Sequence, residues 1–260
     1  MPIPTAAAPA ETSLSYALVD ARGTELAAAD AGRPYYAAST IKLHVLRAAL
    51  RAAAAGALDL DARVPATRTF VGADWASFLL EGDHVDPTHP VAGTPIAVRE
   101  LLVRMIDRSS NEATNHVIDL IGLDAVAATV ADLGLAATRV ERRIGDAAAL
   151  AGGATNETSA EDLARTMHAI VAPGASGRDL ALAALRAQQI PVIATALRPG
   201  VEWGSKSGWV EGYRHDVAVL GDPDSEDLQV LAVMTAGLAQ GEADRRIAGI
   251  VRELVPDLAA

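Results

Sequence analysis

The chain has 260 residues, of which half are hydrophobic, 21% are charged and 3% are aromatic, and its formal net charge is -11. This composition is typical of a globular protein with a substantial core, and it excludes a disordered or fibrous chain. The negative charge repels nucleic-acid phosphates and anionic lipid, so we expect neither as a partner. Because the sequence has no cysteine, disulfides, cysteine-ligated metal centres and a thiol nucleophile are excluded.

Hydrophobic periodicity predicts strands at both ends of the chain and helices between them. An early hairpin is expected from residues 13–20 and 25–29. Residues 67–95 are interpreted as irregular with a short helix, and residues 137–157 as a long loop. Strands are expected over residues 201–208, 214–220 and 228–235, and helices over residues 41–55, 98–106, 112–121, 124–133, 161–171, 178–188 and 243–254.

Strands from the two ends of the chain can pair into one antiparallel sheet, with the helices beside it. We therefore predict an α+β fold in a single domain. Its α/β lobe would comprise residues 1–38 and 190–260, and its helical lobe residues 39–189. The active site would lie between the two lobes.

The basic residues are nearly all arginine, and the two lysines, Lys42 and Lys206, stand out. Lys42 follows Ser39 by three residues at the start of a predicted helix, so the two side chains share one helical face. A serine hydroxyl needs a base to become a nucleophile, and a lysine can serve when burial and nearby positive charge lower its pKa. Ser39 and Lys42 are therefore a candidate nucleophile and base.

Lys206 begins the run Lys206-Ser207-Gly208 in a predicted strand. A cation, a hydroxyl and a strand edge without a side chain together favour a peptide-like ligand that carries a carboxylate. Between the two lysines, Ser109 and Asn111 lie at a break between helices. Their side chains can relay a proton and hold an amide.

These three motifs, in this order, resemble the class A β-lactamase and penicillin-binding-protein superfamily of serine hydrolases, with its S-x-x-K, S-D-N and K-T-G signatures. The resemblance covers almost the whole chain and implies the β-lactamase/transpeptidase-like fold. It implies that Ser39 is acylated, that Lys42 is its base or proton shuttle, and that Ser109 passes the proton to the leaving group.

The same resemblance implies the binding residues. Asn111 would hold the substrate amide, and Lys206 with Ser207 would bind the substrate carboxylate beside Gly208. The backbone N–H groups of Ser39 and Trp209 would form the oxyanion hole. A further anion contact is expected from Arg214 or His215.

The chain departs from the superfamily at three positions. Ser110 replaces the aspartate of S-D-N, and Ser207 replaces the threonine of K-T-G, and both changes keep the required groups. In the loop over residues 138–158, which resembles the omega loop, Ile144 stands where class A enzymes carry the glutamate that activates the deacylating water. The nearest carboxylates, Asp146 and Glu141, are the possible replacements, although Asp146 is more simply interpreted as one side of a loop salt bridge to an arginine.

Without that glutamate, we expect a Ser-Lys acyl hydrolase that is a poor β-lactamase and acts on esters, amides or D-amino-acid peptides. The alternatives are a working class A β-lactamase with a relocated base and an inactive binding homologue. We expect a monomer with a small-molecule or peptide-like substrate and no cofactor or metal. Asp86 and His89, with Asp83 and His84, are interpreted as a solvated loop. With no recognisable signal sequence, the chain as it stands is expected to be cytoplasmic, or exported if a signal has been removed.

Overall fold

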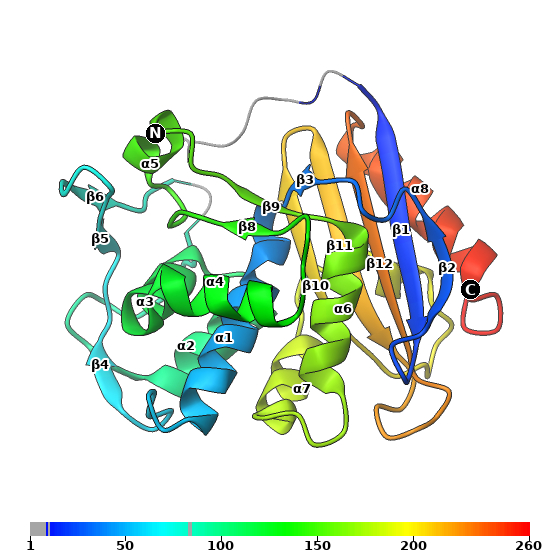
Figure 1. Cartoon of the computed structure of the whole chain (residues 1–260), viewed down its shortest axis with the longest axis horizontal. Helices are drawn as coiled ribbons and strands as arrows, with labels where there is room; N and C mark the ends of the chain where they lie inside the picture. Colours follow the sequence, from blue (N-terminus) through cyan, green and yellow to red (C-terminus); the bar gives the residue numbers. More distant parts are fainter. Residues whose placement is uncertain (1–8, 10, 83–84) are drawn as a thin grey trace.

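The computed structural model of the chain describes residues 9, 11–82 and 85–260 (Figure 1). Within these residues, no helix is long and apolar enough to cross a membrane. The strands are β1 (Ser13–Asp20), β2 (Glu25–Ala29), β3 (Tyr35–Tyr36), β4 (Arg63–Pro65), β5 (Thr69–Val71), β6 (Ser77–Leu79), β7 (Pro95–Ala97), β8 (Arg139–Val140), β9 (Asn156–Thr158), β10 (Trp203–Val210), β11 (Tyr213–Leu220) and β12 (Gln229–Ala236).

The helices fill the middle of the chain and its end. Two of them, η1 and η2, are short 3₁₀ turns. In chain order they are η1 (Ala38–Ile41), α1 (Lys42–Ala54), α2 (Val98–Asp107), α3 (Asn111–Ile121), α4 (Leu123–Asp132), α5 (Ala147–Ala151), α6 (Ala160–Val171), α7 (Arg178–Arg186), η2 (Ile193–Ala196) and α8 (Gln240–Leu254).

The main sheet is built from both ends of the chain, as predicted. Its order is β10-β11-β12-β1-β2, and every neighbouring pair is antiparallel. The first long strand pairs with the last one, from Ser13 opposite Ala236 to Asp20 opposite Gln229. As a result, β10 lies at one edge of the sheet, next to the helices of the middle of the chain (Figure 1).

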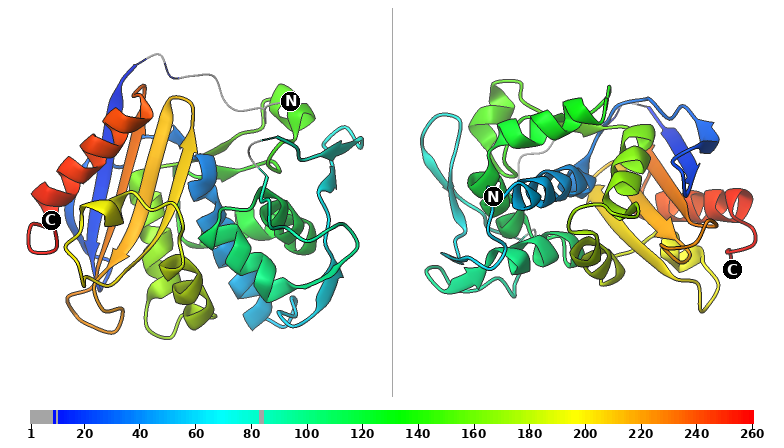
Figure 2. Two further views of the ribbon diagram at one scale, coloured as in Figure 1. Left: turned by 180° about the vertical axis from the view of Figure 1, so that it is seen from behind. Right: turned by 60° about the horizontal axis from the view of Figure 1, so that its bottom comes forward.

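Helices cover the two faces of this sheet (Figure 2). Successive side chains of a strand point to opposite faces, so Ala17 and Val217 join the core under α6 and α1, whereas Leu18 and Ala218 join a second core under α8. In β11, odd-numbered residues such as Val217 therefore face α1 and α6, and even-numbered residues such as Ala218 face α8.

Helix α1 is the central helix of the fold. It contacts α3, α4 and α6, and its first nine residues are buried except Arg47, which is half-buried. The buried surface of α1 thus extends over nearly its whole circumference, as expected of a helix with neighbours on several sides. This position fixes the start of α1, and with it Lys42, inside the protein.

Two segments differ from the prediction. The described residues of the first segment, 67–82 and 85–95, form no helix. Strands β5 and β6 form a hairpin in which Phe70 pairs with Phe78, with ring centroids 6.0 Å apart. The predicted loop over residues 137–157 contains β8, α5 and the start of β9. These elements are two to five residues long, so they depend on tertiary contacts rather than on periodicity.

Candidate active site

Ser39 lies in the short turn η1, one residue after a strained position. Ala38 has a φ of 47°, in the left-handed region that costs a non-glycine residue free energy. The chain then continues as η1 and directly into α1, so that Ser39 and Lys42 stand on consecutive turns. The strained backbone holds Ser39 at the point where the helical part of the chain meets β10.

Lys42 is fully buried, and four oxygen atoms surround its amine. Its Nζ lies 3.2 Å from Ser39 Oγ, 3.0 Å from Ser109 Oγ, 2.6 Å from the Ser109 carbonyl oxygen and 2.7 Å from Asn111 Oδ1. The structure thus brings together four residues that were singled out separately in the sequence. They come from η1, α1, the α2–α3 break and the start of α3.

Burial lowers the pKa of Lys42 well below its usual value, and the charge of Lys206 lowers it further, whereas Glu112 opposes the shift. A neutral amine has two N–H donors and one lone pair. The Ser109 carbonyl and Asn111 Oδ1 can only accept hydrogen bonds, so they use both donors. The lone pair is then left for a hydroxyl that can donate, which is Ser39 or Ser109. This is the arrangement that a general base for Ser39 requires.

Ser109 and Ser110 shape the break between α2 and α3. Ser109 has a φ of 57°, a second strained non-glycine position at the site. Ser110 is the N-cap of α3, where its Oγ accepts a hydrogen bond from the Ala113 N–H at 3.2 Å. Serine caps helices as well as aspartate does, which explains physically why Ser110 can stand in the place of the aspartate. Its hydroxyl also donates to the buried carboxylate of Glu112.

The Lys206-Ser207-Gly208 run lies in the edge strand β10. A Cβ built on Gly208 would come within 3.0 Å of the backbone nitrogens of Ser39 and Thr40. Glycine is therefore required because the strand passes against the turn that carries Ser39. This close approach places the Ser39 N–H beside β10.

The β10–β11 hairpin determines where the amide of Trp209 points. The two strands are joined by two residues in a turn after Val210, so the pair Val210 and Tyr213 exchanges hydrogen bonds. Such pairs alternate along an antiparallel ladder. The amides of Ser207 and Trp209 therefore point away from β11, to the outer edge of the sheet. The Trp209 N–H thus points to the side on which an oxyanion hole with Ser39 would need it.

The structure ties both proposed anion contacts to other groups. Arg214 is on the face of β11 covered by α8, where its Nε donates to Asp244 Oδ1 at 2.7 Å. His215 faces the helices, but its ring is fully buried between two partners, the Tyr36 carbonyl oxygen at 3.0 Å and the Thr235 N–H at 3.2 Å. Both ring nitrogens of His215 thus have protein partners, whereas Arg214, directly opposite Trp209 of β10, remains a predicted anion contact.

Lys206 is fully buried. Burial lowers its pKa to about 7 and the charge of Arg214 acts in the same direction, whereas the carboxylates of Asp216 and Asp107 oppose the shift. Its Nζ donates to the Ser207 carbonyl oxygen at 2.6 Å. The Ser207 hydroxyl donates to the Ile190 carbonyl oxygen at 2.6 Å. Both side chains predicted to bind a carboxylate thus have protein acceptors.

The backbone around Ile144 is held by two asparagines. Asn115 Oδ1 accepts from the Ile144 N–H and its Nδ2 donates to the Ile144 carbonyl oxygen, both at 2.8 Å. Asn156 Oδ1 accepts from the N–H of Glu141 at 3.1 Å, and its Nδ2 donates to the Arg142 carbonyl oxygen. The loop is therefore fixed, with an apolar side chain in the place of the expected glutamate. Asn115 follows Asn111 by one turn of α3, and this spacing on one helical face is the signal that could have placed Asn115 near the candidate site.

Neither candidate carboxylate is positioned as an unengaged base. Asp146 is the N-cap of α5; its Oδ1 accepts from the Ala149 N–H at 2.9 Å and its Oδ2 from the Ala73 N–H at 3.0 Å. Two backbone donors thus take the place of the arginine partner that the salt-bridge interpretation expected. Glu141 is exposed and pairs with Arg139.

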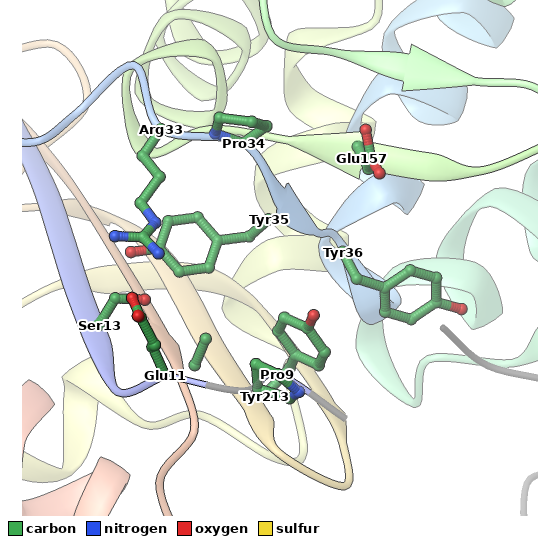
Figure 3. A pocket seen from close by; sticks show the side chains of 10 residues that line it. Pro9, Glu11, Ser13, Arg33, Pro34, Tyr35, Tyr36, Glu157 and Tyr213 are labelled. Atoms are coloured by element: carbon green, nitrogen blue, oxygen red, sulfur yellow. The ribbon is translucent and has the colours of Figure 1, made fainter. Parts of the chain in front are cut away.

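A hollow of about 380 Å³ lies beside β3 and the start of β11. Figure 3 shows Tyr35, Tyr36 and Tyr213 around it, with Arg33 over the ring of Tyr35 at 5.7 Å. Tyr36 also connects this region to the loop after β8, because Arg142 donates to its hydroxyl at 3.1 Å. None of the residues predicted for catalysis or binding lines this hollow.

The solvated-loop interpretation of residues 83–89 is wrong for the two residues that can be tested. Asp86 and His89 are buried, Asp86 pairs with Arg104, and its N–H donates to Glu112. Asp83 and His84 lie outside the described residues. In the part of the chain that the structure describes, no group of three or more acidic or histidine side chains is arranged to hold a metal.

Comparison with known proteins supports the same superfamily. The model of the beta-lactamase enzyme family matches residues 3–257. No curated protein matches the chain. Among solved structures, the beta-lactamase from Sphaerobacter thermophilus DSM 20745 is 27% identical with a TM-score of 0.75, and the alignment covers 94% of this chain and 90% of that one.

Two further structures are similar in fold. The class A beta-lactamase from Mycobacterium abscessus is 22% identical with a TM-score of 0.77, over 94% of this chain and 93% of that one. A variant of PBP-A in its acyl-enzyme complex with penicillin G is 22% identical with a TM-score of 0.76, over 95% and 91%. The predicted β-lactamase/transpeptidase-like α+β fold is confirmed.

Proposed function

The chain belongs to the beta-lactamase enzyme family, and from that premise we propose that it hydrolyses esters or amides through an acyl-enzyme on Ser39 and is a poor β-lactamase. The observation that carries the proposal is the environment of Lys42. Its amine is buried, it lies 3.2 Å from Ser39 Oγ, and its two N–H donors are used by oxygens that can only accept. A similar fold in PBP-A supports acylation, since a variant of that protein is an acyl-enzyme with penicillin G.

In the acylation step, Lys42 Nζ takes the proton of Ser39 Oγ, which forms a bond to the substrate carbonyl carbon. The carbonyl electron pair moves onto oxygen, where the N–H groups of Ser39 and Trp209 stabilise the negative charge. The tetrahedral intermediate then expels the leaving group. Its proton comes from the Lys42 ammonium through Ser109, whose Oγ lies 3.0 Å from Nζ.

In the deacylation step, water must lose a proton as it attacks the ester on Ser39. The expected glutamate is replaced by Ile144, and the carboxylates of Asp146 and Glu141 have partners already. Lys42 is the nearest remaining base, and a nucleophile supplied by the substrate is an alternative to water. We therefore expect deacylation to limit turnover of penicillin.

A working β-lactamase with a relocated base is the second candidate, and Asp146 favours it by proximity in sequence to Ile144. Its hydrogen bonds argue against it, because both carboxylate oxygens already accept from backbone N–H groups and one of these bonds would have to be given up before Asp146 could activate a water. An inactive binding homologue is the third candidate. The contacts between Ser39, Lys42 and Ser109 argue against that one, because a binder needs no such proton path.

The test is rapid mixing with a chromogenic cephalosporin and, separately, a chromogenic ester. We expect a burst of about one acyl group per enzyme with the cephalosporin, a slow steady rate after it, and faster turnover of the ester. Turnover of the cephalosporin at tens per second without a burst, a rate typical of evolved enzymes, would support the second candidate. A collapse of that rate in Asp146→Asn would then identify Asp146 as the base. No reaction with either substrate would support the binding homologue.

A further inference from the structure

The carboxylate of Glu112 is fully buried in the first turn of α3, and the proton transfers described above do not use it. We propose that Glu112 is a positioning residue that anchors the break between α2 and α3 around Lys42 and supplies a negative charge to the buried surroundings of that amine. The inference rests on the proposed function and makes it more specific, because it names a group that acts on the candidate base without contacting the substrate.

Three groups meet at the Glu112 carboxylate. The Asp86 N–H lies 3.0 Å from Oε1 and 3.1 Å from Oε2. The Ser110 hydroxyl donates to Oε2 at 3.1 Å, and Arg68 Nε lies 3.6 Å from Oε1. An ionised carboxylate has two acceptor oxygens for these donors, whereas an amide has only one. Glu112 therefore joins the start of α3 to two points of the segment that precedes α2.

Ser110 connects this anchor to the candidate site because of its place in the chain. It follows Ser109, whose carbonyl oxygen and hydroxyl lie 2.6 and 3.0 Å from Lys42 Nζ. It precedes Asn111, whose Oδ1 lies 2.7 Å from the same nitrogen. The left-handed φ of 57° at Ser109 has a cost in free energy that the surrounding contacts must offset. Loss of the bond between Ser110 and Glu112 is therefore expected to displace the oxygens that bind the amine.

The turn that begins at Asp86 is itself fixed, so Glu112 is tied to a well-held part of the protein. Asp86 Oδ1 accepts from the N–H and the hydroxyl of Thr88 at 2.8 and 2.6 Å. Its Oδ2 pairs with Arg104 of α2 at 3.1 Å, and its carbonyl oxygen accepts from Arg68 at 3.1 Å. Arg68 thus contacts both partners of the bond between Asp86 and Glu112.

The charge of Glu112 is its second contribution. Burial lowers the pKa of Lys42 and the charge of Lys206 lowers it further, whereas Glu112 opposes the shift. The charges that act on Lys206 come from other residues, which are Asp216, Arg214 and Asp107. Removal of the Glu112 charge is therefore expected to lower the pKa of Lys42 and to leave that of Lys206 in place.

The other ionisable groups around Glu112 keep a constant charge above about pH 6.5. Arg68 and Arg104 are permanently charged, and Arg104 pairs with Asp86. Burial lowers the pKa of His89, and the carboxylates of Glu112 and Asp86 oppose that shift. His89 is therefore neutral in this range, and a changed pH profile in a Glu112 variant reports the loss of the Glu112 charge.

The experiment measures how fast the penicillin adduct forms between about pH 6.5 and pH 9.5. Lys42 acts as a base only when it is neutral, so the rate rises with pH through the pKa of the amine and then reaches a plateau. In Glu112→Gln we expect the rise to move to lower pH and the plateau to fall about threefold or more, because the amine is less basic and its anchor has lost an acceptor. Glu112→Asp keeps the charge on a shorter side chain and should lower the plateau without moving the rise.

Asp162→Asn is the matched control. Asp162 is another buried carboxylate in the first turn of a helix, α6, where its Oδ2 accepts from the Ala137 N–H at 2.9 Å and the Thr138 hydroxyl at 2.8 Å. This variant should leave both the rise and the plateau unchanged. A wild-type profile in Glu112→Gln, or the same change in Asp162→Asn, would overturn the inference and leave the proposed function intact. No adduct on the wild-type protein, or an adduct on Ser39→Ala, would overturn the proposed function itself.

Arg68→Gln is the second variant should Glu112→Gln fold poorly. The Arg68 side chain is 36% exposed, so its replacement is better tolerated than a change at a fully buried position. It removes the cation nearest to Glu112 and leaves the negative charge of the carboxylate less compensated. The rise in the acylation rate should then move to higher pH, opposite to the shift in Glu112→Gln. A shift to lower pH, or an unchanged profile, would overturn the inference.

Discussion

Lys42 is the residue whose chemistry depends most on its surroundings. An arginine in its place would keep a positive charge beside Ser39, but a guanidinium does not lose its proton in a protein. Lys42 must be able to become a neutral amine that accepts the proton of Ser39, and a permanent positive charge at this position would not be enough for Ser39 to react.

Lys42→Arg is accordingly expected to slow acylation by about 10²–10⁴-fold, the usual contribution of a general base. Intact-mass spectra after mixing with penicillin measure the rate at which the adduct appears. Ser39→Ala is the control and should give no adduct at any time. Acylation of Lys42→Arg at the wild-type rate would show that another group takes the proton.

Ile144→Glu tests the missing deacylation base. Because Asn115 holds the Ile144 backbone through both its N–H and its carbonyl oxygen, a new side chain should leave the loop in place. We expect the steady rate after the penicillin burst to rise about tenfold or more. Ile144→Gln has nearly the same shape without the charge and should leave the rate unchanged. A similar gain in both variants would assign the effect to loop packing.

Much of the site could be predicted at the level of single residues. The spacing of Ser39 and Lys42 and the order of the three motifs identified the groups that the structure brings together around Nζ. The contacts of Arg214 with Asp244 and of His215 with Tyr36 could not be predicted, because each joins residues that are distant in sequence. The face of the sheet to which each β11 side chain points also depends on the register of the strands, and the sequence alone does not fix that register.

At the level of elements, the contact between β10 and η1 determines how closely the two halves of the site approach. Gly208 permits this contact because a Cβ there would lie 3.0 Å from two backbone nitrogens. Backbone atoms cannot move aside as the end of a flexible side chain can. The strand would therefore have to shift away from Ser39.

Gly208→Ala is expected to destabilise the protein by about 1–3 kcal/mol through overpacking and to lower the acylation rate. The control is Gly249→Ala in α8, where a Cβ would meet nothing within 4 Å and alanine should stabilise the helix by up to about 1 kcal/mol. Urea unfolding and the penicillin burst measure the two effects. A Gly208→Ala protein with native stability and rate would show that β10 can retreat without consequence.

The long elements were predictable and the short ones were not. The sequence predicted α1, α2 and β11 within a few residues, because α2 buries a regular apolar stripe and α1 and β11 are long apolar segments buried on several sides. The β5–β6 hairpin and α5 depend on each other: Asp146 caps α5 and also accepts the Ala73 N–H from the hairpin. No local pattern reveals such a contact between segments more than 70 residues apart.

At the scale of the whole molecule, fully buried histidines link folding to pH. Burial lowers the pKa of His44 to about 3 and that of His215 to about 4. The unfolded chain binds these protons near pH 6.5 while the folded chain does not. Their contribution to stability is therefore complete above that pH and is lost progressively as the pH falls. Asp216 acts in the opposite direction below about pH 6, because burial raises its pKa to about 6.

Urea midpoints are thus expected to fall between about pH 6.5 and pH 4, and His44→Gln should make that fall shallower. Glutamine can replace part of the bridge that His44 makes between Thr158 and Thr166. The measurement is a series of urea titrations of both proteins at several pH values. Identical pH profiles would show that His44 does not contribute.

The pairing of β1 with β12 has a consequence for how the protein is made. Residues 13–20 leave the ribosome more than 200 residues before their partners at residues 229–236. During that interval one edge of β1 has no native partner, and unpaired edges are where chains associate wrongly. Closing so large a loop also delays the decisive step of folding. The candidate site needs β10 as well, because Gly208 lies against the turn that carries Ser39. A nascent chain therefore carries Ser39 and Lys42 for most of its synthesis before the site is complete.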